Sequence, residues 1–201
     1  MTANGEEIEL KDRLRLIESM IAEGRRSTES WGWTFVLWGV AYYVALAWSI
    51  LGRGHWADWA WPVTMISAAT LTVAIGMRKC RTHPATKTGR AIASIWNAMG
   101  ISMMLLFPAL SISGRIDFHG FIAMVAAMLG LTNAASSMTL RWKAQFACAV
   151  VWWAASVAAC FGPDKQPLIV FVVAIFFCQI AFGAYAMVLD ARRRALVASH
   201  A

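Results

Sequence analysis

The sequence predicts an all-α fold: a six-span transmembrane helix bundle preceded by an N-terminal cytoplasmic amphipathic helix. Three observations predict it: six continuous apolar stretches, basic residues concentrated in alternate connections, and an amphipathic segment before the first stretch. Each stretch is long enough to cross a hydrocarbon core of roughly 30 Å as a helix. The stretches are continuously apolar rather than alternating, which favours a helix bundle over a barrel.

The first predicted element is a helix over residues 6–24 with one apolar stripe. The stripe repeats at spacings of four, three and four residues and consists of Leu10, Leu14, Ile17 and Ile21. Residues 1–24 carry six acidic and three basic side chains, so an anionic leaflet would repel this segment. We therefore expect the stripe to bind protein: a second copy of the chain, the basic inner loops of its own bundle, or another cytoplasmic protein.

Six predicted spans follow and define the organisation of the chain. Residues 1–30 are the cytoplasmic helix and linker, residues 31–190 the bundle, and residues 191–201 a basic cytoplasmic tail. The spans are Trp31–Leu51, Trp59–Met77, Ala91–Ile112, Phe118–Met138, Ala144–Phe161 and Leu168–Leu189. Most of the connections are short, so consecutive spans are expected to pack as antiparallel hairpins.

Basic residues orient the bundle. Fifteen of the eighteen Lys and Arg residues lie before the first span, in the second and fourth connections, or in the tail. The other three connections carry only Arg53, Arg115 and Lys165. By the positive-inside rule both termini lie in the cytoplasm. The net charge of +7 is then a property of the cytoplasmic face, and we expect no nucleic-acid partner.

The fourth span carries a continuous strip of small residues on one face. In lipid, small residues let helix backbones approach closely, so we expect this span to be a central packing helix. The strip repeats at spacings of three and four residues and consists of Gly120, Ala123, Ala127, Gly130, Ala134 and Ser137.

Ionisable side chains are missing from the hydrocarbon part of every predicted span. Intramembrane charges usually mark proton relays or ion paths, and no histidine lies in mid-membrane to ligate a haem. The stretch Ser111–Gly114 resembles the rhomboid GxSG motif but lacks its first glycine, and no intramembrane histidine could serve as its base. We therefore expect no enzymatic activity and no cofactor.

Two outer connections each pair a histidine with an aspartate. The four residues are His55, Asp58, Asp117 and His119. Imidazole and carboxylate groups suit Zn(II), and four of them could complete its shell if the two connections meet. Solvated side chains in short interfacial loops are the competing interpretation.

Seven of the eleven tryptophans lie near the predicted membrane interfaces, where they form an aromatic belt. The deeper tryptophans and amides could instead line a small-molecule pocket with aromatic walls. The candidates are Trp38, Trp96, Asn97, Asn133, Trp152, Trp153 and Gln179. In the competing interpretation the amides pair across helices and the indoles fill space.

Two short motifs near the ends of the chain carry a family resemblance. They are Ile17-Glu18-Ser19-Met20-Ile21 through Trp31-Gly32-Trp33, and Phe182-Gly183-Ala184-Tyr185-Ala186-Met187 before Arg192-Arg193-Arg194. With these motifs the chain resembles a group of small bacterial multispan (six-helix) membrane proteins that has no assigned functional family. The resemblance implies a bacterial inner-membrane protein and transfers no functional residue.

Three functional hypotheses remain open. In the first, a non-enzymatic regulatory or scaffolding protein senses a lipid or small lipophilic ligand in its bundle and binds a second subunit or a partner through its N-terminal helix. The second is a passive channel or facilitator for small solutes or ions. The third is the divalent metal site at the outer face.

Overall fold

The computed structural model describes residues 9–16, 18–19, 22, 31–52, 54–57, 59–82 and 87–199. All regular structure in these ranges is helical, as the continuous apolar stretches predict. Five helices are long and apolar enough to cross a membrane, so the chain has the helices of a multi-pass membrane protein. In chain order the elements are α2 (Gly32–Leu51), η1 (Gly54–Trp56), α3 (Ala60–Thr82), α4 (Lys87–Ile112), α5 (Phe118–Leu140), α6 (Lys143–Ala159), α7 (Gln166–Ile175), η2 (Phe176–Ala181) and α8 (Phe182–Ala198).

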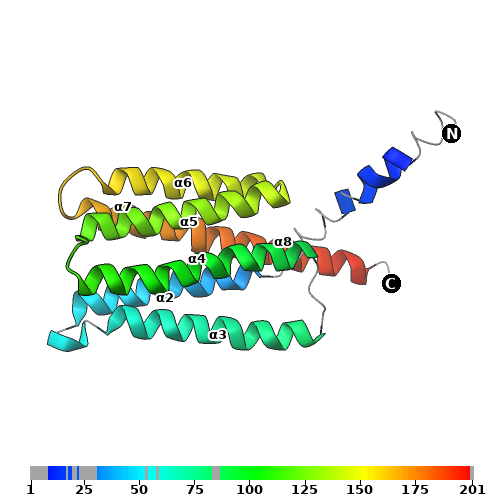
Figure 1. The fold of residues 1–201 in the computed structure, drawn as a ribbon. Helices are drawn as coiled ribbons and strands as arrows, with labels where there is room; N and C mark the ends of the chain where they lie inside the picture. The colour runs from blue at the N-terminus through cyan, green and yellow to red at the C-terminus, as the bar shows by residue number, and fades with distance from the viewer. Residues whose placement is uncertain are drawn as a thin grey trace.

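The long helices lie side by side as one bundle (Figure 1). Helix α2 packs against α3 on one side and against η2 and α8 on the other, while α5 packs against α4, α6 and α7. The segments α7, η2 and α8 follow one another without a break and form a single long helix. Figure 1 shows that α2 begins and α8 ends at the same end of the bundle.

The small-residue strip of α5 lies in the tightest helix pairing. Ser156 on α6 donates its hydroxyl to the carbonyl of Ala123 on α5 at 2.7 Å. A Cβ added to Gly130 would lie 2.6 Å from Nε1 of Trp153 on α6. Of the five spanning helices, α5 has the largest buried share. Within the strip Gly120 and Ala127 are half-buried and the other four residues are buried.

Helices α2 and α8 approach each other most closely at two glycines. A Cβ added to Gly32 would lie 2.9 Å from the carbonyl oxygen of Gly183, and a Cβ added to Gly183 would lie 2.9 Å from the carbonyl oxygen of Gly32. Any larger residue at either position would push the backbones apart. This contact joins the beginning of the bundle to its last helix.

The N-terminal segment is described only in part. Residues 9–16 are helical, and Leu10 and Leu14 are exposed there. Arg13 donates to Glu9 at 2.6 Å across one helical turn. Ile17 and Ile21, the other half of the predicted stripe, lie outside the described residues.

Candidate functional site

Three amide side chains lie buried in the interior of the bundle, and they come from three different helical segments. Asn133 on α5 and Gln145 on α6 have no exposed surface, and Gln179 in η2 is 2% exposed. An amide taken out of water into an apolar interior is unfavourable unless its donors and acceptors find partners. The hydrogen bonds of these three groups therefore decide what the interior can do.

Much of the hydrogen-bonding capacity of these amides is unused within the described part of the chain. Nδ2 of Asn133 donates to the carbonyl of Leu129 at 2.9 Å, one turn back along α5. Oδ1 of Asn133, Oε1 of Gln179 and both amide atoms of Gln145 are buried without a partner there. Each such group destabilises a protein by about 1–3 kcal/mol. Unpaired buried groups in a native protein call for a further partner, such as water or a ligand.

The α5–α6 hairpin sets the level of Asn133 in the bundle. Gly130 on α5 lies directly against Trp153 on α6, so these two positions face each other. Asn133 lies one turn nearer the connection between the two antiparallel helices. A helix rises 1.5 Å per residue, so Asn133 lies opposite about the first two turns of α6. These two turns include Gln145.

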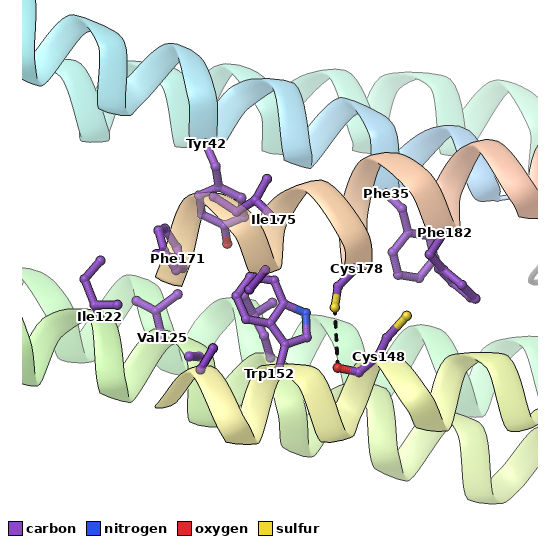
Figure 2. Close-up of a cluster of buried hydrophobic side chains, with 14 of the residues drawn as sticks. Phe35, Tyr42, Ile122, Val125, Cys148, Trp152, Phe171, Ile175, Cys178 and Phe182 are labelled. Carbon is purple, nitrogen blue, oxygen red and sulfur yellow. Dashed lines mark hydrogen bonds between the residues drawn. The ribbon is translucent and has the colours of Figure 1, made fainter. Parts of the chain in front are cut away.

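The contact between α6 and η2 brings the third amide to the same region. The thiol of Cys178 donates to the carbonyl of Cys148 at 3.5 Å, as Figure 2 shows. Gln179 is the next residue after Cys178, and Gln145 lies on the same buried face of α6 as Cys148. The amides of α5, α6 and η2 therefore lie within about two helical turns, roughly 11 Å, along the bundle axis.

A π-helical turn positions Gln179. The buried face of the last long helix repeats every four residues, at Phe171, Ile175, Gln179 and Gly183. An α-helix advances about 100° per residue, so positions four apart drift by about 40° at each repeat. The wider turn of η2 offsets this drift and keeps the later positions directed at the core. Such π turns are frequent at functional sites.

Gly39 on α2 makes room for this part of η2. A Cβ added to Gly39 would lie 2.9 Å from Cβ of Gln179 and 2.7 Å from Cδ1 of Ile180. Further along α2, the hydroxyl of Tyr43 donates to the carbonyl of Val172 at 2.9 Å. The η2 turn that carries Gln179 thus packs against Gly39 of α2 and against Cys148 of α6.

Trp152 is the largest fully buried side chain among the described residues. Its ring centroid lies 5.8 Å from that of Phe171 (Figure 2). Its indole Nε1 is buried without a hydrogen-bond partner in the described part of the chain. Since Trp152 shares the buried face of α6 with Gln145, it adds an unused donor to the same side of the helix.

Trp38 on α2 and Trp96 on α4 each pack against a buried aromatic side chain of α2 and lie against the core of the bundle. Trp96 donates its indole N–H to Oγ of Ser136 at 3.1 Å and stands edge-on to Phe35 with ring centroids 5.3 Å apart. Trp38 packs beside Tyr42 with ring centroids 6.3 Å apart. Both indoles are half-buried.

The predicted pocket residues therefore fall into three places. Asn133, Trp152 and Gln179 lie in the core, and Trp38 and Trp96 lie half-buried at its edge. Asn97 is exposed on α4, and Trp153 is 38% exposed where it covers Gly130. These last two side chains lie on the outside of the bundle.

The predicted metal ligands do not form a cluster in the described residues. No group of three or more His, Cys, Asp or Glu side chains comes together there, and Asp58 lies outside the description. Asp117 caps α5, because its Oδ1 accepts from the backbone N–H of Gly120 at 2.9 Å. Nδ1 of His119 lies 3.8 Å from the other carboxylate oxygen of Asp117, while His55 is exposed in η1.

No protein-family model, curated protein or solved structure matches this chain. Its function must therefore be argued from its own residues. Gly32 of the first terminal motif lies against Gly183 of the second. That contact explains these two glycines as packing positions.

Sequence reasoning missed Gln145 and the glycine contacts of α2. Gln145 follows Lys143 closely, so hydropathy places it at the membrane interface, although it is fully buried. Its helical spacing from Cys148 and Trp152, three and seven residues, was the available signal. Gly32 and Gly39, seven residues apart on α2, carried a similar signal for close packing.

Proposed function

We propose that this chain is a non-enzymatic integral membrane protein of the bacterial inner membrane, with a regulatory or scaffolding role, that binds a small lipophilic ligand in its core. The observation that carries the proposal is the set of buried amides without partners on α5, α6 and η2. A ligand that hydrogen-bonds to them removes the cost of their burial, so ligand binding and bundle stability are coupled.

The proposed topology has six spans with both termini in the cytoplasm. The five long apolar helices supply five of them, and α6 supplies the sixth. Helix α6 has 17 residues, a length of about 25 Å that approaches the hydrocarbon thickness. Its extensive packing against α5 and the basic residues of the cytoplasmic connections support this count.

The chemistry of the amides defines the ligand class. Carboxamides both donate and accept hydrogen bonds but carry no charge. The buried polar side chains among the described residues are all neutral Thr, Ser, Asn and Gln, and an unpaired charge in such surroundings would be strongly unfavourable. The ligand is therefore a neutral lipophilic molecule with one or two hydrogen-bonding groups, such as a hydroxyl, a ketone or an amide.

Native mass spectrometry of the full chain released from mild detergent tests this proposal. We expect a retained small molecule on the wild type and its loss from Gln145→Met and Gln179→Met, which keep side-chain length but remove the amide. The matched control is Gln166→Met at the start of α7, where the side chain is half-buried; this variant should keep the ligand. The proposal is contradicted if the wild type carries no bound small molecule. It is also contradicted if Gln145→Met and Gln179→Met retain the ligand as Gln166→Met does.

The N-terminal helix is the proposed protein-binding element. Leu10 and Leu14 are 59% and 52% exposed, so the described half of the stripe is available to a second copy or to a cytoplasmic partner. Deleting residues 1–24 should reduce association while membrane insertion stays intact, as measured by cross-linking and membrane fractionation. The double change Leu10→Ser and Leu14→Ser should act like the deletion, whereas Arg13→Gln should not. Association that survives both the deletion and the double change excludes this role.

A further inference from the structure

Helix α4 is the least enclosed of the five spanning helices. Only 6% of the residues in its apolar segment are buried, against 56% for α5. Its extensive packing is with α5 alone among the described helices. Apart from this face and the contact of Trp96 with Phe35 of α2, the surface of α4 faces lipid or another protein.

Asn97 is the polar exception on that surface. Ser94 and Ser102, also exposed on α4, each donate their hydroxyl to a carbonyl one turn back, at 2.9 Å and 2.8 Å. The Asn97 amide is exposed and makes no hydrogen bond within the described part of the chain. It lies six residues inside the predicted span that begins at Ala91, at a depth of about 9 Å. Hydrocarbon offers an amide no partner at that depth.

The residues around Asn97 allow a second helix to approach closely. Asn97 belongs to a heptad strip with spacings of four, three and four residues, which is the spacing of a left-handed helix pair. Gly100 lies in the middle of the strip, and a Cβ added to it would meet nothing within 4 Å. The strip, called here the Asn97 strip, consists of Ala93, Asn97, Gly100 and Met104.

We propose that the Asn97 strip is a contact between two copies of this chain in the membrane, closed by reciprocal hydrogen bonds between the two Asn97 amides. Copies inserted in the same orientation are related by a two-fold axis along the membrane normal, so equivalent residues lie at equal depth. A carboxamide is both donor and acceptor and is therefore its own complement across such an axis. A different protein would need a matching polar group at the same depth, which a second copy supplies automatically.

Energy transfer between labelled copies of the full chain tests this contact. Copies carrying Ser199→Cys, with the four native cysteines replaced by serine, are labelled and diluted in vesicles of phosphatidylethanolamine and phosphatidylglycerol. Removing the two interhelical amide bonds with Asn97→Val should weaken association about tenfold. Asn97→Gln keeps the amide and should retain association. Ser102→Ala, one of the exposed serines with an internal partner, should leave it unchanged.

Disulfide trapping provides the independent measurement. On the background without native cysteines, Asn97→Cys should form a covalent dimer under mild oxidation. Leu131→Cys on the exposed side of α5 should not. The proposal is overturned if Asn97→Val associates as strongly as the wild type. It is also overturned if the wild type is a monomer at every dilution. If Asn97→Cys forms a disulfide with a different protein in native membranes, the Asn97 strip binds that protein and the proposal is also overturned.

Discussion

Gly130 allows α5 and α6 to pack closely, because any side chain at this position would collide with the indole of Trp153. Gly130→Leu should therefore separate the two helices. Overpacking a close contact costs about 1–3 kcal/mol. We expect a clear fall in the melting temperature of the protein in detergent, measured by intrinsic tryptophan fluorescence.

Ala154→Leu is the matched control for this change. Ala154 is the residue next to Trp153 and is exposed on α6, so its enlargement should leave the melting temperature nearly unchanged. Equal stability of Gly130→Leu and the wild type would show that α6 can move away from α5 without loss. The small-residue strip would then not be a packing surface.

At the level of single residues, two of the amides predicted to line a pocket are buried, while their role in a pocket stays a prediction. Asn133 and Gln179 stand in mid-span, and an amide there must be either a pocket residue or an interhelical partner. Asn97 is also an asparagine and lies at a similar predicted depth to Asn133, yet its side chain is exposed. The direction of a side chain depends on the neighbours of its helix. Within the described residues the long helices lack a polar side that would have indicated in advance which face points outward.

The π turn of η2 leads to a prediction about the whole last helix. A π turn accommodates one additional residue in an α-helix. Deleting Phe177, which is 56% exposed, should convert η2 to α-helix while Phe171 and Gly183 stay on the buried face. We expect the deletion variant to insert in the membrane and to melt close to the wild type in detergent.

A deletion in a regular helix should behave differently. Removing Leu131, which is 63% exposed in the middle of α5, rotates one half of that helix by about 100° relative to the other. Half of its contacts with α6 are then lost, and the variant should be severely destabilised. Similar destabilisation by both deletions would mean that η2 does not act as a one-residue insertion.

The helices themselves could be predicted from the sequence, but their ends could not. Helix α2 begins one residue after the predicted start, at Gly32, whereas α3 continues to Thr82, beyond the predicted end at Met77. The last helix runs to Ala198 through the basic residues of the tail. Hydropathy detects the part of a helix that lies in hydrocarbon, while backbone hydrogen bonds continue into the headgroup region.

At the scale of the whole molecule, the arrangement of the spans was beyond sequence reasoning. Helix α5 is largely enclosed, whereas few residues of α4 are fully buried, although the two helices are equally apolar. In lipid, apolar residues are equally suited to the inside and the outside of a bundle, so composition does not separate them. Only the small-residue strip of α5 distinguished the enclosed helix in advance.

The proposed topology depends on whether α6 crosses the membrane. An even number of spans puts both ends of the bundle on one side, whereas a chain in which only the five long helices cross has its ends on opposite sides. Cys160, exposed just after α6, and Ser199, exposed after α8, distinguish these cases. With the start of α2 at the cytoplasmic face, six spans place Cys160 outside and Ser199 inside, whereas five spans without α6 place Cys160 inside and Ser199 outside.

Labelling with a membrane-impermeant maleimide in spheroplasts measures this directly. A variant that keeps only Cys160 should be labelled in intact spheroplasts, since the positive-inside rule places the end of α6 outside. A variant that carries only Ser199→Cys should be labelled only after the membrane is opened. Labelling of Ser199→Cys in intact spheroplasts would place the tail outside and exclude the six-span topology. It would also separate the N-terminal helix from the basic residues of the tail, which the six-span topology keeps on the same face.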